Sequence, residues 1–215
     1  MSYGDDDYTE LNALRDTEVG KALRAKRVLF LDTDVTDKIG LEFSKLFTFF
    51  GASKKPVTMY INSPGGEVPS MFRIINMIES APFKVTTVGC GWVCSAALDI
   101  FITGDKRLLW PNSTLLSHQG TDFHYGKIED AKRSVAEQER VHGKVTDHYE
   151  RYTSMTREEI GKFLMPEHDV YVTPEEALLF GMCDEIVEPK IRRKKPKRSK
   201  ALEKFLARSS GKKGK

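Results

Sequence analysis

The stretch YINSPGGEV, residues 60–68, ends an apolar run and enters a turn with two adjacent glycines. The run at residues 57–61 predicts a strand that stops at Asn62. Two glycines in a row cost conformational entropy on folding, so they suit places where φ must be positive or where another group approaches the backbone closely. Taken alone, SPGG is typical of an ordinary tight turn. The rest of the sequence has to show whether these glycines have a more specific use.

The composition predicts a globular protein of one domain with appendages, since 40% of the 215 residues are hydrophobic and 30% are charged. We expect a cytoplasmic protein, because no apolar run is long enough to cross a membrane and the acidic start MSYGDDDYTE is unlike a signal peptide. The cysteines are sparse and odd in number, which fits a reducing compartment, and their spacing predicts no metal site: Cys90, Cys94 and Cys183.

Charge is distributed unevenly along the chain. Residues 190–215 contain 13 Lys or Arg and one acid, a net charge of +12, which leaves −9 on residues 1–189. Such a basic run is typical of a solvated, disordered extension. Clustered basic residues can also bind phosphate, but no aromatic stacking platform accompanies them, so we expect no nucleic-acid partner.

Strand-like and helix-like patterns alternate along the chain. The expected strands are at residues 27–32, 57–62, 84–89, 107–110, 113–118, 169–173 and 182–187. The expected helices are at residues 37–52, 69–80, 94–102, 127–152, 156–164 and 174–180. This order predicts an α/β domain with mostly parallel strands and helices packed outside the sheet.

Ser95 is a candidate nucleophile. It follows the strand at 84–89 and an expected turn at 90–93, and it begins a helix. Such a corner presents the hydroxyl outward, next to the unpaired N–H groups and positive dipole end of the helix. The alternative is an N-cap serine, which is common at helix starts.

A nucleophilic serine needs a base, and His118 is the best placed of the five histidines because it ends the apolar run STLLSH. His142 and His148 are on a highly charged helix and are expected at the surface, while His124 and His168 are in expected loops. A structural histidine is the alternative for His118. Asp169, at the start of DVYVT, could orient the imidazole.

Four segments together resemble the proteolytic subunit of Clp protease, the caseinolytic serine peptidase family: YINSPGG, GCGWVCSAA, WPNSTLLSHQG and DVYVTPEEALLFGMCDEIV. The resemblance extends from about Arg27 to Val187, with the motifs in family order. It implies the Clp/crotonase-like α/β fold, a spiral of β-β-α units with a long protruding handle helix at about 127–152. The remaining segments are then a divergent acidic N-terminus (1–24), the peptidase domain (25–189) and the basic tail (190–215).

The resemblance also implies a catalytic site. Ser95 matches the family nucleophile, His118 the base and Asp169 the residue that orients the base. The amides of Gly66 and Ala96 match the two donors of the oxyanion hole, which would give the SPGG turn its specific use. The implied reaction is hydrolysis of peptide bonds in unfolded polypeptides, with no metal or cofactor in this chain. ATP would be used only by a partner unfoldase.

The implied assembly is a homo-oligomer of stacked heptameric rings, joined through the handle helices and fed by an AAA+ unfoldase. Residues 127–152 fit an intersubunit role, because a charged helix with a thin apolar stripe has little to bury against its own domain. We expect no membrane among the partners of this protein.

The sequence departs from the family pattern in several places. Ala96-Ala97 stands where Met-Gly is usual, Trp92 and Cys94 are larger than usual, and Gly120 replaces a proline. The N-terminal region does not match the family's axial-loop segment, which puts unfoldase docking in question. The alternatives are an inactive or specialised ring subunit, including a processing peptidase, and an acyl-CoA hydratase or isomerase of the same superfamily.

Overall fold

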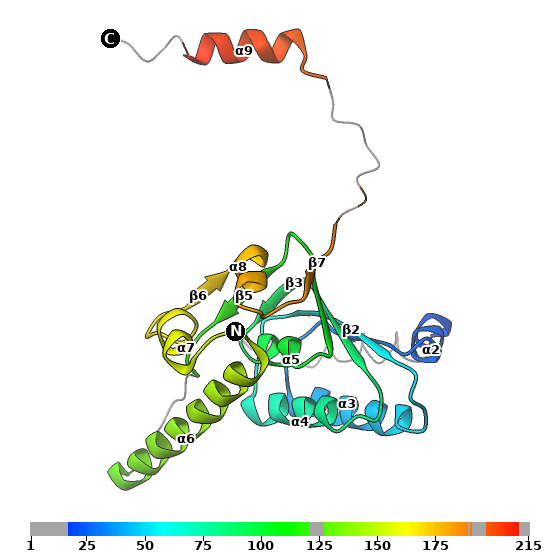
Figure 1. Cartoon of the computed structure of the whole chain (residues 1–215), viewed down its shortest axis with the longest axis vertical. Helices are drawn as coiled ribbons and strands as arrows, with labels where there is room; N and C mark the ends of the chain where they lie inside the picture. The colour runs from blue at the N-terminus through cyan, green and yellow to red at the C-terminus, as the bar shows by residue number, and fades with distance from the viewer. Residues whose placement is uncertain (1–16, 121–126, 189, 191–196, 211–215) are drawn as a thin grey trace.

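The computed structural model describes residues 17–120, 127–188, 190 and 197–210, and these form a seven-stranded sheet with helices around it (Figure 1). The strand order is β1-β2-β3-β4-β7, and β5 joins β3 to β6. Among the described strands, only the β5–β6 pair is antiparallel. The strands are β1 (Val28–Leu31), β2 (Val57–Ser63), β3 (Val85–Cys94), β4 (Lys106–Leu109), β5 (Thr114–Ser117), β6 (Val170–Val172) and β7 (Glu185–Ile186). The prediction of a mostly parallel α/β sheet is confirmed.

The helices follow the predicted order, with one addition at each end. They are α2 (Glu18–Ala25), α3 (Asp37–Phe50), α4 (Val68–Glu79), α5 (Ala96–Ile102), α6 (Ile128–Tyr152), α7 (Arg157–Phe163), α8 (Pro174–Leu179) and α9 (Lys200–Ser210). Neither α2 nor α9 was predicted. The tail from residue 190 was expected to be disordered, whereas residues 200–210 form the short helix α9, which Figure 1 shows away from the body.

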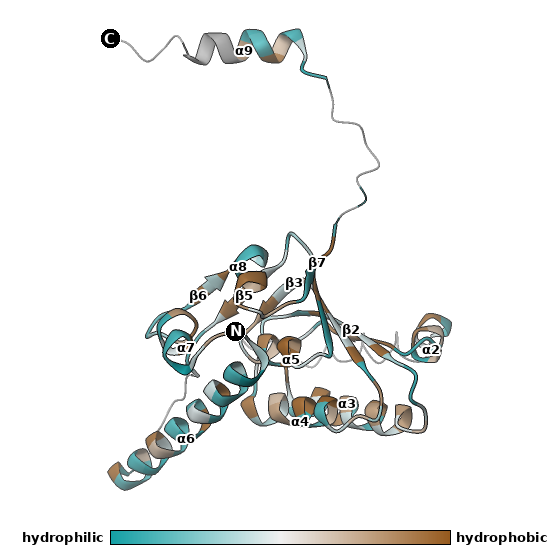
Figure 2. Ribbon diagram, viewed as in Figure 1, coloured by the Kyte–Doolittle hydropathy of each residue, from teal (hydrophilic) through white to brown (hydrophobic). Residues whose placement is uncertain are grey.

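The core lies between the sheet and the helices α3, α4 and α5. The 3.6-residue spacing of apolar side chains gives α3 and α4 one buried face each. These two helices pack on one another, and α4 also packs on α5. Every residue of α5 is buried. Figure 2 shows hydrophobic residues along these three helices, in contrast to the mainly hydrophilic α6. The short helix α5 is therefore surrounded by other parts of the protein.

The strand β3 is longer than predicted and continues through residues 90–93, which the sequence analysis took for a turn. Its first half pairs with β4, from Thr86 to Gly89, and its last three residues pair with β5. A register shift in the β2–β3 pairing, between Ile61 and Ser63, accompanies this change of partner. As a result β3 connects β4 with β5 and β6, and it ends at Cys94, directly before Ser95.

Helix ends follow the capping rules expected from the sequence. Thr156 and Glu159 form a capping box at the start of α7, as predicted, and Thr173 and Glu176 form another at the start of α8. After α8 the chain turns at Gly181, whose φ of 71° favours glycine.

The long helix α6 projects from the body, and Figure 1 shows its N-terminal turns away from the sheet. Ile128 and Val135 are 76% and 54% exposed. Burial is confined to the last turns, at Thr146, His148 and Tyr149. The surface position expected for His148 is wrong, because these turns return to the body and pack against α5.

Arg107 on β4 joins three segments that are distant in sequence. Its guanidinium donates to the Asp184 carboxylate and to the carbonyls of Tyr152 and Gly181, the last two at 2.7 Å. Burial of the Asp184 carboxyl opposes ionisation, but the hydrogen bonds from Arg107 outweigh it and lower its pKa. One side chain thus ties the end of α6 and the α8–β7 turn to the sheet.

We predict that Arg107→Met lowers the free energy of unfolding by about 2–4 kcal/mol, because it removes these bonds and leaves two part-buried carbonyls unpaired. Thermal denaturation measures the loss. Arg73→Met is the matched control: Arg73 pairs with Asp37 at 2.9 Å near the surface, where such a pair contributes less than about 1 kcal/mol. Equal losses in the two variants would contradict the role given to Arg107.

Candidate active site

Ser95 forms the corner between β3 and α5 alone, since β3 ends at Cys94 and α5 begins at Ala96. Its φ of 51° and ψ of −129° are rare for a residue with a side chain. The Ser95 amide donates to the carbonyl of Leu116 at 2.8 Å and so extends the β3–β5 pairing by one residue. Backbone strain of this kind clusters at active sites, where the surrounding structure enforces it.

The Ser95 hydroxyl faces a histidine. Its Oγ lies 2.8 Å from Nε2 of His118, within hydrogen-bonding distance. Within the described residues the Ser95 side chain caps no amide of α5, so the interpretation as a simple N-cap is wrong. The serine–imidazole contact is the geometry that a general base needs to take the hydroxyl proton.

Asp169 lies on the other side of the imidazole because of the β5–β6 register. Ser117 pairs with Val170, so the residue that follows β5 and the residue that precedes β6 are neighbours. Asp169 Oδ1 is 3.4 Å from Nδ1 of His118, longer than a usual hydrogen bond of about 2.7–3.2 Å. The Asp169 side chain is 57% exposed and that of His118 29%. The three side chains predicted from the sequence therefore meet, the third at ion-pair distance.

Both glycines of the SPGG turn are in conformations that favour glycine, with φ of 101° at Gly65 and 148° at Gly66. A Cβ on Gly65 would lie 2.7 Å from the Ser95 Cβ, and one on Gly66 would lie 2.4 Å from the Val35 carbonyl oxygen. The first glycine thus lets the turn lie directly against the Ser95 corner. The second lets residue 35 pair with the turn.

The two amides predicted to donate to an oxyanion are those of Gly66 and Ala96. Val35 donates to the Gly65 carbonyl and accepts from the Glu67 amide, each at 2.7 Å. These bonds flank Gly66, whose own amide enters no hydrogen bond among the described residues. Ala96 is the first residue of α5, where helix N–H groups lack intrahelical partners. The oxyanion-hole role of both amides stays a prediction.

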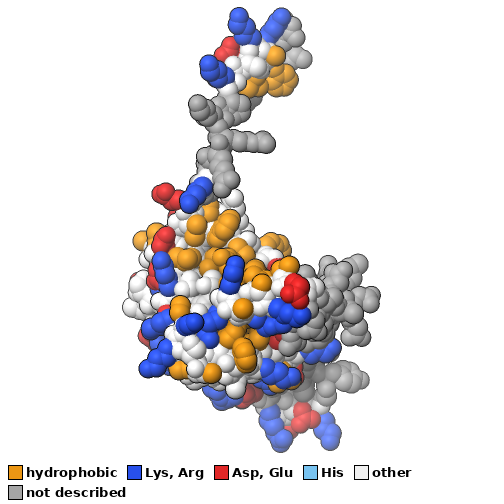
Figure 3. Space-filling view, turned by 90° about the vertical axis from the view of Figure 1, so that its right-hand side faces the viewer, with side chains coloured by type: hydrophobic (Ala, Val, Ile, Leu, Met, Phe, Trp, Pro, Cys, Tyr) orange, Lys and Arg blue, Asp and Glu red, His pale blue; other side chains and the backbone are white. Residues whose placement is uncertain are grey.

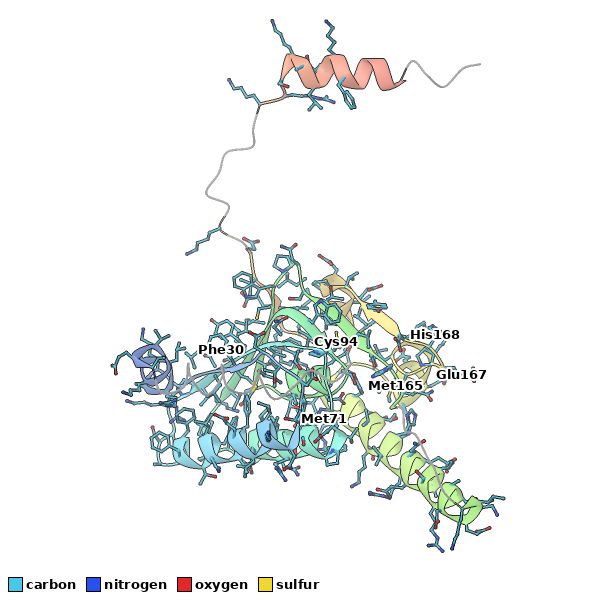
Figure 4. All side chains as sticks on the ribbon, turned by 180° about the vertical axis from the view of Figure 1, so that it is seen from behind. Phe30, Met71, Cys94, Met165, Glu167 and His168 are labelled. Carbon is cyan, nitrogen blue, oxygen red and sulfur yellow. The ribbon has the colours of Figure 1, made fainter. Side chains whose placement is uncertain are left out.

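Other candidate residues lie outside this cluster. Figure 4 labels Cys94 at the end of β3, and burial raises the pKa of its thiol, which disfavours the thiolate nucleophile. Figure 4 also labels His168 in the segment before β6, and His124 lies outside the described residues. The sequence analysis missed Val35, because nothing in its local pattern signals a contact with the SPGG turn.

Among the described residues no group of three or more His, Cys, Asp and Glu side chains is placed to hold a metal ion. The helices of this part of the chain include none long and apolar enough to span a membrane. The expected absence of a cofactor and the cytoplasmic location stay predictions.

Known proteins share both the sequence and the fold. The family model of Clp protease matches residues 12–190. The ATP-dependent Clp protease proteolytic subunit 3 of Rhizobium meliloti is 30% identical over 182 residues, 83% of this chain and 91% of that one. The ATP-dependent Clp protease proteolytic subunit of Deinococcus radiodurans is 26% identical over 178 residues, 81% of this chain and 86% of that one.

A solved structure of a ClpP1 variant from Listeria monocytogenes superimposes with a TM-score of 0.72 at 25% identity. The match covers 79% of this chain and 96% of that one, and it confirms the Clp/crotonase-like fold expected from the sequence. With the family model covering most of the sequence, the chain belongs to the Clp protease family.

Proposed function

We propose that the protein is a serine endopeptidase with Ser95, His118 and Asp169 as its catalytic triad. The observation that carries the proposal is the 2.8 Å contact between Ser95 Oγ and His118 Nε2 at a strained strand-to-helix corner. A serine at such a corner presents its hydroxyl and has a base within reach. The contact makes Ser95 a nucleophile for acyl transfer.

In the proposed reaction His118 accepts the Ser95 proton as the hydroxyl attacks the peptide carbonyl. The amides of Gly66 and Ala96 donate to the oxyanion of the tetrahedral intermediate. His118 then protonates the leaving amine, and water releases the acyl-enzyme by the same route in reverse. Asp169 keeps the imidazole in the tautomer that carries its proton on Nδ1. The chain itself needs no cofactor for these steps.

We further propose that the subunit works in a ring-shaped homo-oligomer. The exposed apolar residues on α6 are not covered by the described residues of their own subunit, and a second copy would cover them. The exposed Asp169 and its 3.4 Å separation from His118 fit a triad that tightens on assembly. Stacked heptameric rings, which the family resemblance implies, would enclose the sites and restrict them to unfolded polypeptides.

A partner ATPase belongs to the same proposal. The relatives are named ATP-dependent, and this chain would receive substrate from a separate AAA+ unfoldase that uses the ATP. An apolar surface is available for docking: Phe30 and Tyr60 stack with ring centroids 5.3 Å apart, and Trp110 is also exposed. Figure 3 shows hydrophobic side chains gathered on one face of the body. A cytoplasmic location stays a prediction from the sequence.

The second candidate is an inactive or specialised ring subunit, such as a processing peptidase. The long distance between His118 and Asp169 favours it, because an unengaged aspartate leaves the imidazole less well oriented. A hydratase or isomerase has less support, since it needs no Ser–His contact. Labelling by a fluorophosphonate, which reacts with activated serines, separates an active subunit from an inactive one.

Ser95→Ala is expected to abolish peptide hydrolysis and fluorophosphonate labelling, a loss of about 10³-fold or more, while the melting temperature stays near that of the wild type. Cys94→Ala is the neighbouring control and should retain both activities, because the Cys94 thiol is buried and protonated. Wild-type turnover by Ser95→Ala would show the triad assignment to be wrong.

Gly65→Ala should slow labelling of Ser95 by at least about tenfold, equivalent to about 1.4 kcal/mol of barrier, because the new methyl must displace the Ser95 corner. Gly161→Ala, on α7, is the control: nothing lies within 4 Å of a Cβ there. Labelling rates at matched folded fractions measure the effect. A wild-type rate in Gly65→Ala would mean that the turn does not support the corner.

Charged substitutions on α6 should prevent assembly. We expect Ile128→Glu and Val135→Glu to shift the protein toward smaller species and to lower peptidase activity, while Val19→Glu, an equally exposed change on α2, leaves both unchanged. Light scattering at micromolar concentration reports the mass. A fully active wild-type species of 24.4 kDa would rule out the ring proposal.

A further inference from the structure

The C-terminal end of α6 contacts two elements next to the candidate site: α5, which follows Ser95, and β5, which precedes His118. Of its 25 residues, the buried ones are Thr146, His148 and Tyr149. His148 and Tyr149 are consecutive, so they point to different neighbours: His148 to α5 and Tyr149 to β5. Since α5 starts just after Ser95 and β5 ends just before His118, any shift of this helix acts on the site from two sides.

Tyr149 reaches the strand that carries the histidine. Its hydroxyl oxygen lies 3.3 Å from Ser117 Oγ, and both residues are 1% exposed. Ser117 immediately precedes His118, and its pairing with Val170 sets the position of Asp169. One hydrogen bond thus joins the Tyr149 hydroxyl to Ser117. Ser117 in turn fixes the position of the His118 imidazole relative to Ser95 and Asp169.

His148 holds α5 in the same way. Its Nε2 is 3.0 Å from the Asp99 carbonyl oxygen and 3.2 Å from Thr103 Oγ1. Burial lowers the pKa of His148, which keeps the ring neutral, so a single Nε2–H can donate to that carbonyl. The contact fixes α5 against α6 without placing a charge in the core.

The Asp99 side chain is the exception in this polar cluster. The residue is 4% exposed, and its Oδ1 has no hydrogen-bond partner among the described residues. Burial raises the pKa of Asp99 to about 8, so the carboxyl is neutral at pH 7. Burial and then the Asp99 charge also raise the pKa of Tyr149. The charge of an ionised Asp99 therefore acts on the Tyr149 hydroxyl.

The described groups around α5 offer the Asp99 carboxylate no cation in contact. On the elements packed against α5, the buried titratable side chains are His148 and Tyr149 of α6 and Cys94 of β3, within the part of the chain that the structure describes. Glu79 of α4 and Arg151 of α6 act on His148 from nearer the surface. An ionised Asp99 would need a hydrogen-bond donor, and because α5 packs against α6 we take the Tyr149 hydroxyl as that donor, in competition with Ser117.

We propose that Tyr149 is a positioning residue for His118 and that the buried Asp99 carboxyl makes this position sensitive to alkaline pH. The inference rests on the proposed peptidase function, because its main readout is turnover. While Asp99 is neutral, the Tyr149 hydroxyl stays with Ser117 and His118 is held against Ser95. When Asp99 ionises, the hydroxyl turns away and the imidazole loses its support.

The first experiment removes the hydroxyl alone in the full-length protein. Tyr149→Phe should lower kcat for a fluorogenic peptide about tenfold with KM changed less than twofold, since one supporting hydrogen bond is lost and no substrate contact is. Tyr152→Phe is the matched control, because that hydroxyl donates to Glu79 at 2.8 Å and should leave kcat unchanged. Wild-type kcat in Tyr149→Phe overturns the proposal.

Ser117→Ala tests the same bond from its other end and serves where Tyr149→Phe does not fold. It should lower kcat to the same extent, and the double variant should be no slower than either single one. Additive losses would mean that the two hydroxyls act separately, which contradicts the proposed link.

The second experiment is the pH profile of kcat. The wild type should lose activity as pH rises through about 8, whereas Asp99→Asn and Asp99→Leu, which cannot ionise, should keep it. Stability should follow the same sign: the folded state holds a proton that the unfolded chain releases, so the wild type loses stability from about pH 4 to pH 8. Profiles that coincide between wild type and both variants overturn the role of Asp99.

Hydrogen exchange separates this inference from the proposed function. Tyr149→Phe should speed exchange in residues 114–119 and leave residues 57–61 unchanged, whether or not the protein hydrolyses peptides. An inactive wild type with this exchange pattern would contradict only the peptidase proposal. Active wild type with uniform or unaltered exchange in Tyr149→Phe would contradict only the positioning role.

Discussion

At Ser95 the backbone leaves β3 with a φ of 51° while its amide still donates to the Leu116 carbonyl at 2.8 Å. The sheet therefore holds the amide nitrogen of Ser95, although the backbone at this residue has already turned out of the strand. That constraint explains the features around it. β5 must run beside the last residues of β3, so His118 emerges next to the serine, and the adjacent turn must contain a residue without a Cβ, since Gly65 lies against Ser95 Cβ.

Much of this arrangement could be predicted because it is encoded locally. Apolar periodicity located most strands and helices, and Thr156 with Glu159 gave the start of α7. The error at residues 90–93 has a physical cause: glycine usually marks a turn, but here it allows close packing inside a strand. A Cβ on Gly91 would lie 2.2 Å from Asn62 Oδ1, and one on Gly89 would lie 2.6 Å from Leu109 Cδ1. Only the neighbouring strands reveal that use of glycine.

The residues of the candidate site likewise include some that the sequence predicted and some that it did not. Ser95, His118 and Asp169 each stand at the end of a predicted element, so motif and position pointed to them together. Tyr149 and His148 gave no signal, because they belong to a helix whose composition is that of a solvated one. Its last turns are buried by tertiary contacts, which include α5, α7 and β5. Residues that position a catalytic group through the core are harder to predict than the group itself, since their role depends on contacts between segments distant in sequence.

Asp99 shows why such contacts matter energetically. A carboxyl with a pKa of about 8 opposes folding at neutral pH, because the native state must keep a proton that the unfolded chain gives up. An apolar side chain of similar size at this position would avoid that cost, as replacements of buried charges elsewhere indicate. The hydroxyl of Tyr149 would keep Ser117 as its described partner, and the proposed link from α6 to His118 would no longer respond to proton concentration. In the proposed mechanism the acid makes the fold less stable and, when it ionises, gives the Tyr149 hydroxyl a second partner, through which the projecting helix α6 would act on His118.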